Sequence, residues 1–474
     1  MIILYFSIAF ILASLVFFFK NQTVNRIMSG LFLLSQIGFN FYSISNIGKY
    51  DSIYYKFDAL GGLFSIVLSI LSLATFYHSY LYFQRHEFSK KQESAYYSAL
   101  IMLIASMMSA NYAENIALLW VSIEATTLFV SLLIFHERTK DALEAAWKYL
   151  FISSVGVAIA FMGILFFSMA PGINGLSTLS LNNLIMNAKD INPLWLKIAF
   201  LLVLTGFSAK MGIFPLHTVT VDAHTVAPPP ISAFISTSLM NVGFLGIFRI
   251  FTIIAKTSTL YWAQNVLLIV GIISITMSAI QILRTKHYKR MFAFSSLEHM
   301  GIVALGLAAG GIGYYAAILH LVFHSFVKAS LFYQIGQVHS IYKSYYFKDT
   351  GKYFKFYSLG GLAFLLCFVC ITAIPPSGLF ISEFLIFKAL FIQNRIIVAI
   401  LALVLLTVIL YVFGKNTLHL LYADKPENVD LNNVTINKFE TLSQFVLLGL
   451  VIYLGISPPI FFTDLINSAI SILK

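Results

Sequence analysis

The sequence predicts an all-α protein that crosses a membrane many times. The chain has 474 residues, of which 59% are hydrophobic and only 10% are charged. Soluble domains carry about 25% charged residues. The mean hydropathy is +0.86 over the whole length, so there are too many apolar residues for one core under a polar surface. Long apolar stretches recur along the chain, which is typical of a polytopic membrane protein.

About fourteen apolar segments approach the length of a membrane helix, which is roughly 20 residues. The predicted ranges are 1–19, 24–45, 59–84, 96–111, 113–135, 141–169, 195–215, 229–255, 260–283, 290–309, 313–337, 356–392, 396–413 and 441–471. The first segment has no basic residues before its apolar run and no small-residue cleavage site, which favours a retained helix over a signal peptide.

Most Lys and Arg residues fall in the connections on one side of this arrangement, for example Arg85, Lys140 and Lys286. By the positive-inside rule, these connections face the cytoplasm and both termini lie outside. The net charge of +11 reflects these loops and does not indicate nucleic-acid binding, because no basic run is interleaved with stacking aromatic residues.

Two of the predicted segments are interrupted by proline. SAKMGIFPLHTVTVDAHTVAPPPISA contains Pro215 and the prolines 228–230, and CITAIPPSGLFISEFLIFKAL contains Pro375 and Pro376. Proline removes a helix hydrogen bond, and inside lipid the freed backbone must line a wet or protein-enclosed cavity. One broken segment in each half of the chain is typical of transporters built from inverted repeats.

Ionisable residues lie deep in several apolar segments. They are Glu124, Lys148, Lys210, Lys328 and Glu383. A charge at the centre of a bilayer costs at least about 2.5–3.5 kcal/mol, so such residues usually line a polar path or a binding site. Their recurrence through the chain predicts that protons or ions cross the protein.

His320, His324 and Lys328 follow one another at intervals of four residues in AILHLVFHSFVKASLF. This spacing places them on one stripe of a helix, over about 12 Å of its axis. Because histidine titrates near neutrality, the stripe predicts a proton relay. Two other interpretations stay open: the histidines could be haem or metal ligands, or they could hydrogen-bond neighbouring helices.

Lys210 and Glu124 are expected to form a pair. Each has a long apolar run beside it, in LKIAFLLVLTGFSAK and ALLWVSIEATTLFVSLL. A change in the strength of such a pair would change the affinity of the lysine for a proton, so the pair would act as a switch. The alternative is a static buried ion pair.

A further set of residues either extends the path or supports its loops. The set consists of Glu144, His217, Asp222, His224, Glu298 and His299. Glu144 also suits a helix start as a cap, and Lys148, one turn later, can extend toward the membrane interface. The three residues around the first break could bind a metal, although hydrogen bonds that hold the loop are the preferred interpretation.

The two cysteines, Cys367 and Cys370, form CFVC within an apolar run. Neither a second cysteine pair nor a nearby histidine accompanies them, so two apolar core residues are expected and no cofactor or metal is assigned. Redox chemistry, if the protein takes part in it, would belong to partner subunits.

Together these motifs resemble the antiporter-like subunits of respiratory complex I and its relatives. The matching segments are WVSIEATTL, AAWKYL, FSAKMGIFPLHT with the following DAH and AP, KRMFAFSSLEHMG, LH-x3-H-x3-K and PPSGLFISEF. They run from about residue 113 to about residue 390 in the family's order and spacing. SIEATTL and SSLEHMG look most like component F of hydrogenase 4 and formate-hydrogenlyase-type complexes.

The resemblance implies fourteen transmembrane helices, with two inverted five-helix repeats that contain broken helices. It implies N-terminal helices in 1–111, an antiporter-like proton-translocation core in 112–393 and C-terminal helices in 394–474. The residues it carries over to a proton path are Glu124, Lys148, Lys210, His320, His324, Lys328 and Glu383.

Two positions depart from the family pattern. Many relatives have a lysine eight residues before the arginine numbered Arg249 here, and this chain has Asn241. A neutral amide can hydrogen-bond water but cannot hold a proton, so this step of the path would pass through ordered water. The usual HTWLPDAH is HTVTVDAH in this chain.

The function implied is that of a proton-translocating membrane subunit of a multisubunit redox complex, either a hydrogenase or an NADH–quinone oxidoreductase type. Its expected partners are other membrane subunits and a peripheral arm with a [NiFe] hydrogenase and iron–sulfur subunits, in the cytoplasmic membrane of a bacterium or archaeon. The alternatives are a subunit of a multisubunit cation/proton antiporter and a membrane anchor that does not pump.

Overall fold

The computed structural model describes residues 1–169, 179–424, 437 and 439–473. It shows a polytopic α-helical protein. Among these residues, eleven helices are long and apolar enough to cross a membrane, or up to thirteen if each of two bent helix pairs counts as one span. This confirms the predicted fold class. The chain divides into two compact units, each of which is described by itself.

Unit 1 consists of Met1–Pro228, Ser238–Asn265 and Phe461–Lys474. Its helices are α1 (Ile2–Phe19), α2 (Gln22–Ser45), α3 (Ala59–Arg85), α4 (Lys90–Tyr112), α5 (Ile116–Ile134), η1 (Phe135–Glu137), α6 (Lys140–Ser168), α7 (Leu181–Met186), η3 (Ala188–Asp190), α8 (Pro193–Met211), α9 (Thr218–Val226), α11 (Met240–Ile254) and most of α20 (Ile460–Ser471). The strands β1 (Tyr50–Ser52) and β2 (Tyr55–Lys56) form a small antiparallel hairpin.

Unit 2 consists of Pro229–Thr237 and Val266–Ile460. Its elements are α10 (Pro229–Phe234), the first part of the π-helical segment η4 (Ile235–Leu239), most of α12 (Leu260–Arg284), α13 (Tyr288–Ala309), α14 (Ile312–Tyr342), η5 (Phe347–Asp349), α15 (Tyr353–Phe356), α16 (Ser358–Ile371), α17 (Gly378–Ile392), α18 (Ile396–Tyr422) and α19 (Leu442–Ile456).

Each predicted membrane segment corresponds to one helix or to an interrupted helix. The predicted segment 356–392 is two helices, α16 and α17, because the chain turns at Pro375 and Pro376. The predicted segment 441–471 is likewise two helices, α19 and α20, separated by a break. Hydropathy therefore located the apolar segments, but it did not show where a segment bends.

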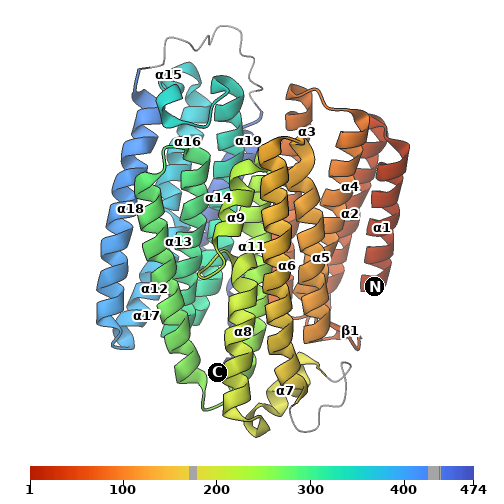
Figure 1. Ribbon diagram of the computed structural model, residues 1–474, viewed down its shortest axis with the longest axis vertical. Helices are drawn as coiled ribbons and strands as arrows, with labels where there is room; N and C mark the ends of the chain where they lie inside the picture. Colours follow the sequence, from red (N-terminus) through yellow and green to blue (C-terminus); the bar gives the residue numbers. More distant parts are fainter. Residues whose placement is uncertain (170–178, 425–436, 438, 474) are drawn as a thin grey trace. The chain divides into compact units, whose positions relative to one another are not determined.

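In unit 1, α6 and α8 run side by side (Figure 1). A Cβ atom at Gly156 of α6 would lie 2.9 Å from the carbonyl oxygen of Gly206 on α8, and one at Gly163 would lie 2.8 Å from that of Ala199. These glycines let the two backbones touch, as small residues commonly do between membrane helices. The close approach fixes the distance between α6 and the end of α8, which carries Lys210.

The first predicted break is confirmed at the end of α8. The helix stops at Met211, and Gly212 follows with a φ of 75°, a left-handed conformation that glycine adopts without strain. The backbone N–H of Leu216 donates to Ser208 Oγ at 3.3 Å, and Thr220 Oγ1 donates to the carbonyl of Ala209 at 2.7 Å. Side chains thus satisfy backbone groups at the break, as a membrane interior requires.

The second predicted break is confirmed between α16 and α17. Ser377 caps α17: its Oγ accepts from the N–H of Leu379 at 3.1 Å and donates to the carbonyl of Cys370 at 3.1 Å. One short side chain therefore serves both helix ends. This orders the start of α17, the helix that carries Glu383.

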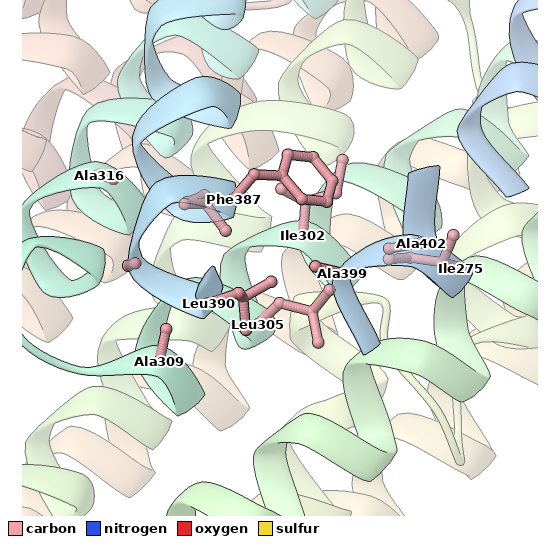
Figure 2. Packing of buried hydrophobic residues seen from close by; sticks show 11 residues of the cluster. Ile275, Ile302, Leu305, Ala309, Ala316, Phe387, Leu390, Ala399 and Ala402 are labelled. Atoms are coloured by element: carbon pink, nitrogen blue, oxygen red, sulfur yellow. The ribbon is translucent and has the colours of Figure 1, made fainter. Parts of the chain in front are cut away.

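Unit 2 has an apolar core that holds α17 against α13. Figure 2 shows Phe387 and Leu390 of α17 beside Ile302 and Leu305 of α13, within one cluster of buried residues. Ala399 of α18 belongs to the same cluster. The ionisable residues of α13 and α17 lie about one turn from this apolar core, so the packing sets how closely they approach.

Candidate functional site

Lys210, at the end of α8, is buried in unit 1 with 1% of its surface exposed. Its ammonium group donates a hydrogen bond to Tyr149 Oη at 2.9 Å and lies 4.8 Å from the centre of the same ring. The hydroxyl and the ring face of Tyr149 both stabilise a cation. Lys210 is therefore held by a neutral residue of α6.

Glu124, on α5, is held by two hydroxyl groups. Ser154 Oγ of α6 donates to its carboxylate at 2.6 Å, and Thr127 Oγ1 donates at 3.4 Å. Both Glu124 and Lys210 are among the described residues, and they form no direct ion pair. The charge of Glu124 nevertheless acts on Lys210 and on Tyr149 through space. The predicted pair is therefore a longer-range interaction with Tyr149 next to the lysine.

The register of α5 against α6 is fixed one turn before Glu124. Trp120 Nε1 donates to the carbonyl of Val157 at 2.7 Å. This bond and the bond from Ser154 to Glu124 join the same two helices one turn apart. The position of the carboxylate is thus set by two hydrogen bonds and not by a flexible side chain alone.

Asn241, 3% exposed, lies in the first turn of α11, directly after the π-helical segment η4. A Cβ atom at Gly243 would lie 2.6 Å from the carbonyl carbon of Lys210. The first turn of α11 therefore rests against the end of α8. Single π-helical turns inside helices often occur at functional sites.

Lys148 lies apart from the buried residues of unit 1. Its side chain is 51% exposed and forms an ion pair of 2.5 Å with Glu144, whose side chain is 64% exposed. The next residue along α6, Tyr149, is 1% exposed and contacts Lys210. The two neighbours point to different faces of the helix, so Lys148 and Glu144 lie on the outer face.

His217 and His224 lie at the start and in the last turn of α9, the short helix after the first break. His217 is 5% exposed and His224 is fully buried, whereas Asp222 between them is half-buried. These positions, next to the end of α8, are compatible with the predicted support of the loop.

Lys328, on α14 of unit 2, is buried with no exposed surface. Its ammonium group donates to the carbonyl of Phe292 at 2.6 Å and forms a short hydrogen bond to Ser295 Oγ. Both acceptors belong to α13. Lys328 therefore points away from its own helix and toward the helix that carries Glu298 and His299.

Three residues from three helices form a hydrogen-bonded chain in unit 2. His299 Nδ1 of α13 lies 3.1 Å from His320 Nε2 of α14, and His320 Nδ1 lies 2.9 Å from Ser382 Oγ of α17. Both histidines are fully buried. His324, one turn along α14 and also buried, has its ring centre 5.1 Å from that of His299. His299, which was only a secondary candidate from the sequence, is thus central to the cluster.

Two carboxylates lie beside these histidines. Glu383 Oε1 is 3.9 Å from His299 Nδ1, and the side chain of Glu383 is 13% exposed. Glu298, 4% exposed, lines a cavity of about 30 Å³ together with Glu383, Ile371 and Thr372. This volume holds a single water molecule. His299, His320 and Glu383 of unit 2 therefore form a compact group, with one ring nitrogen or carboxylate oxygen of each within 4.8 Å of the others.

Sequence reasoning missed the neutral residues that hold the charged ones. Tyr149, Ser154, Ser295 and Ser382 each hydrogen-bond a candidate residue from another helix. Each stands within or beside a motif that was recognised, but a hydroxyl in an apolar helix gives no signal of its partner.

A partly buried ion pair in unit 1 was also missed. Arg249 Nη2 lies 2.5 Å from Asp58 Oδ2 and donates to the carbonyl of Asn111 at 2.9 Å. The pair borders a cavity of about 310 Å³ in unit 1, near Ser468 of α20. Asp58 also caps α3, which gives it a structural role.

The fold and the site define a polytopic membrane protein with ionisable groups buried between its helices. Comparison with known proteins supports this class. The family described as NADH:quinone oxidoreductase/Mrp antiporter, transmembrane, matches residues 113–410. The chain belongs to this family, and the resemblance predicted from its motifs is confirmed.

Two curated relatives and one solved structure illustrate the similarity. The chain is 34% identical to the hydrogenase-4 component F homolog of Methylacidiphilum infernorum (isolate V4) over 66% of each protein. It is 27% identical to hydrogenase-4 component B of Escherichia coli (strain K12) over 72% of this chain and 51% of that protein. The matched region thus spans about two thirds and about half of these relatives.

The solved structure is a chain of the membrane-bound sulfane sulfur reductase, an archaeal respiratory membrane complex. It superimposes with a TM-score of 0.87 at 22% identity, over 100% of this chain and 97% of that chain. The whole fold is therefore shared, including the helices outside the matched family region.

Proposed function

We propose that the protein is a proton-translocating membrane subunit of a multisubunit redox complex of the hydrogenase or NADH–quinone oxidoreductase type. The observation that carries the proposal is the direct contact between His299, His320 and Ser382, next to Glu383, inside apolar helices. Ionisable and polar side chains are costly to bury inside a membrane, and those that are buried there usually mark an ion or proton pathway.

In unit 2, the groups are arranged so that a proton can move in short steps. Lys328 contacts α13 through Ser295, and α13 carries Glu298 and His299. A proton would then pass from His299 to His320 across 3.1 Å, or to Glu383, whose Oε1 lies 3.9 Å from His299 Nδ1. Imidazole can donate through one nitrogen and accept through the other, which suits a relay.

In unit 1, Glu124 and Lys210 would act as a switch. The two charges interact without a direct ion pair, and the ammonium group rests on Tyr149. Because charge interactions are strong in a dry interior, a small displacement of α5 would change how tightly Lys210 holds its proton. Lys148 and Glu144, on the outer face of α6, would contribute only if another subunit covered them.

The proposed partners are other membrane subunits and a peripheral arm that contains a [NiFe] hydrogenase with iron–sulfur subunits. The similarity to two hydrogenase-4 components supports this choice. Purification in a mild detergent should bring down a nickel-containing subunit. Recovery of NADH-oxidising subunits instead would favour the complex I type.

We place the protein in the cytoplasmic membrane of a bacterium or archaeon, with both termini outside. Within unit 1, the amino group of Met1 pairs with Asp51 at 3.1 Å, and Ser468 of α20 lines the same cavity as Asp58. Both ends of the chain thus lie near the connection between α2 and α3, which supports a common side. Alkaline phosphatase fused to the C-terminus should be active, and green fluorescent protein should not.

The main test is Lys210→Ala in membrane vesicles that contain the assembled complex. We expect redox-driven proton uptake to fall to background while the chain still inserts, because the switch has lost its cation. Lys197→Ala is the matched control, since Lys197 is a half-buried lysine on the same helix. Proton uptake in Lys210→Ala equal to that of the control would refute the proposal.

A cation/proton antiporter subunit is the second candidate, because the family includes Mrp antiporters. The nitrogen-rich cluster of unit 2 argues against sodium as the transported ion, since hard cations prefer oxygen ligands. Sodium-dependent transport without a redox partner would support this candidate.

A measured stoichiometry of zero protons per electron would instead indicate a membrane anchor that does not pump.

A further inference from the structure

The histidine cluster of unit 2 offers three metal-binding atoms to a single point. They are His299 Nδ1, His320 Nε2 and a carboxylate oxygen of Glu383, and they lie within 4.8 Å of one another. The two nitrogens are 3.1 Å apart, and His299 Nδ1 is 3.9 Å from Glu383 Oε1. In a tetrahedral zinc site with bonds of about 2.0–2.1 Å, neighbouring ligand atoms are about 3.3 Å apart. The observed distances bracket this value.

The hydrogen bonds around His320 orient its free electron pair toward this point. Ser382 Oγ donates its only hydrogen to the carbonyl of Leu379 at 2.9 Å. It must therefore accept from His320 Nδ1, which lies 2.9 Å away and carries the ring hydrogen. The other nitrogen of His320, Nε2, is then an acceptor that faces His299. Metal-binding histidines are usually fixed in this way, by a bond from the second ring nitrogen to a neighbouring acceptor.

The surroundings provide space and negative charge. On the Glu383 side of the cluster, a cavity of about 30 Å³ has room for one water molecule. Glu298 lines that cavity and is 4% exposed, and its Oε2 has no hydrogen-bond partner among the residues that the structure describes. An unpartnered buried carboxylate oxygen is costly, and a nearby dication would offset that cost.

We propose that His299, His320 and Glu383 form a binding site for a Zn²⁺-type transition-metal ion. The ion would take the position of the hydrogen between the two imidazoles. Imidazole with carboxylate suits zinc and its neighbours in the transition series, whereas Mg²⁺ and Ca²⁺ take oxygen ligands only. A bound ion would occupy the atoms that pass protons, so it would block the relay. This consequence rests on the proposed function, whereas the binding site itself does not.

Direct binding tests the site without any proton movement. The purified full-length chain, freed of metals with a chelator, should bind about one Zn²⁺ in equilibrium dialysis, and excess Mg²⁺ or Ca²⁺ should not displace it. Co²⁺, used as a spectroscopic probe, should give the visible absorption bands of a tetrahedral site with nitrogen and oxygen ligands. If the wild-type chain takes up no Zn²⁺ after chelation, the site does not exist.

Variants then locate the ion. His320→Ala and Glu383→Gln should each weaken Zn²⁺ binding by at least about tenfold and abolish the Co²⁺ bands. Ser382→Ala should weaken binding by about 10–100-fold by releasing His320, and Ser382→Thr should restore it. His339→Ala is the matched control: it removes a histidine near the end of the same helix, away from the three ligand residues, and should leave binding unchanged. Equal binding by wild type, His320→Ala and Glu383→Gln would overturn the assignment.

Two controls distinguish loss of Zn²⁺ binding from misfolding and from loss of proton uptake. Each variant is first compared with wild type by gel filtration and thermal unfolding, and the wild-type Co²⁺ spectrum needs no variant at all. If Zn²⁺ binds, it should inhibit proton uptake by the assembled complex, and a chelator should restore uptake. Binding without inhibition would support the metal site but would show that protons do not pass along its ligand atoms. Absence of binding would refute the metal site and would not bear on the proposed proton transport.

Discussion

Units 1 and 2 each bury a lysine near a broken helix, but they hold it differently. Lys210 rests on the hydroxyl and ring of Tyr149, and its acid, Glu124, is bound elsewhere by Ser154. In unit 2, Lys328 reaches the helix of Glu298 and His299, where side chains contact one another directly. The interaction between the separated charges of Glu124 and Lys210 changes when the helices move slightly. The directly contacting side chains of unit 2 are instead suited to proton transfer. On the proposed function, this difference predicts that unit 1 controls the proton affinity of Lys210 and that unit 2 conducts protons.

The largest expected effect is that of Lys328→Ala, because it removes a fully buried lysine whose ammonium group contacts the helix of Glu298 and His299. Loss of a proton-transferring side chain typically slows the transfer by about 100-fold or more, so proton uptake in vesicles should fall to background. Lys343→Ala, at the exposed end of the same helix, is the control. Substantial uptake by Lys328→Ala would mean that unit 2 does not conduct through this lysine.

Gly206→Ala should break the geometry of unit 1 through packing alone. The added Cβ would lie 2.6 Å from the backbone nitrogen of Ala160, so α6 and α8 would have to separate. Overpacking of this kind costs about 1–3 kcal/mol, which thermal unfolding in detergent can measure. Gly38→Ala, a helix position with no atom within 4 Å, should be neutral or slightly stabilising. Similar destabilisation by both changes would show that the glycine contact is unimportant.

Tyr149→Phe should have an intermediate effect that separates the two interactions of Lys210. It keeps the ring under the ammonium group and removes the hydroxyl acceptor. A hydrogen bond to a charged group is worth about 1.5–3 kcal/mol, so proton uptake should fall by about 10–150-fold. Tyr149→Leu, which also loses the ring, should fall further. If both variants resembled wild type, unit 1 would not depend on this contact.

The smallest effect is expected for Lys148→Ala, because the lysine is on the outer face of α6 and forms an ion pair with an exposed glutamate. Exposed ion pairs contribute little, so proton uptake should stay within about twofold of wild type. Uptake reduced as strongly as in Lys210→Ala would place Lys148 in the path after all. It would also imply that a partner subunit covers this face.

The membrane spans and both breaks could be predicted from the sequence, because apolar length and proline have the same consequence wherever they occur in lipid. The face on which a residue lies could not. In an apolar helix both faces are hydrophobic, so periodicity does not show that Tyr149 faces Lys210 while Lys148 faces outward. The same holds for His299 and Ser382, which meet His320 from two other helices.

The division into residues 1–111, 112–393 and 394–474 stays a prediction, as do the transport roles of the individual residues. Their placement nevertheless follows from features with a sequence signal. Glycines at 156, 163 and 206 set the contact between α6 and α8. The serine before the second break, Ser377, caps the helix that brings Glu383 to the histidines.

The burial of α13 has a consequence for the order of events during synthesis. This helix is surrounded by protein over nearly its whole length, whereas most of α18 is exposed. It carries Glu298 and His299, and the residues that accompany them on α14 and α17 are made later by the ribosome. A helix with such polar groups enters lipid poorly by itself. We therefore expect α13 to stay beside the insertion machinery until α14 and α17 have emerged, and to leave with them as a group.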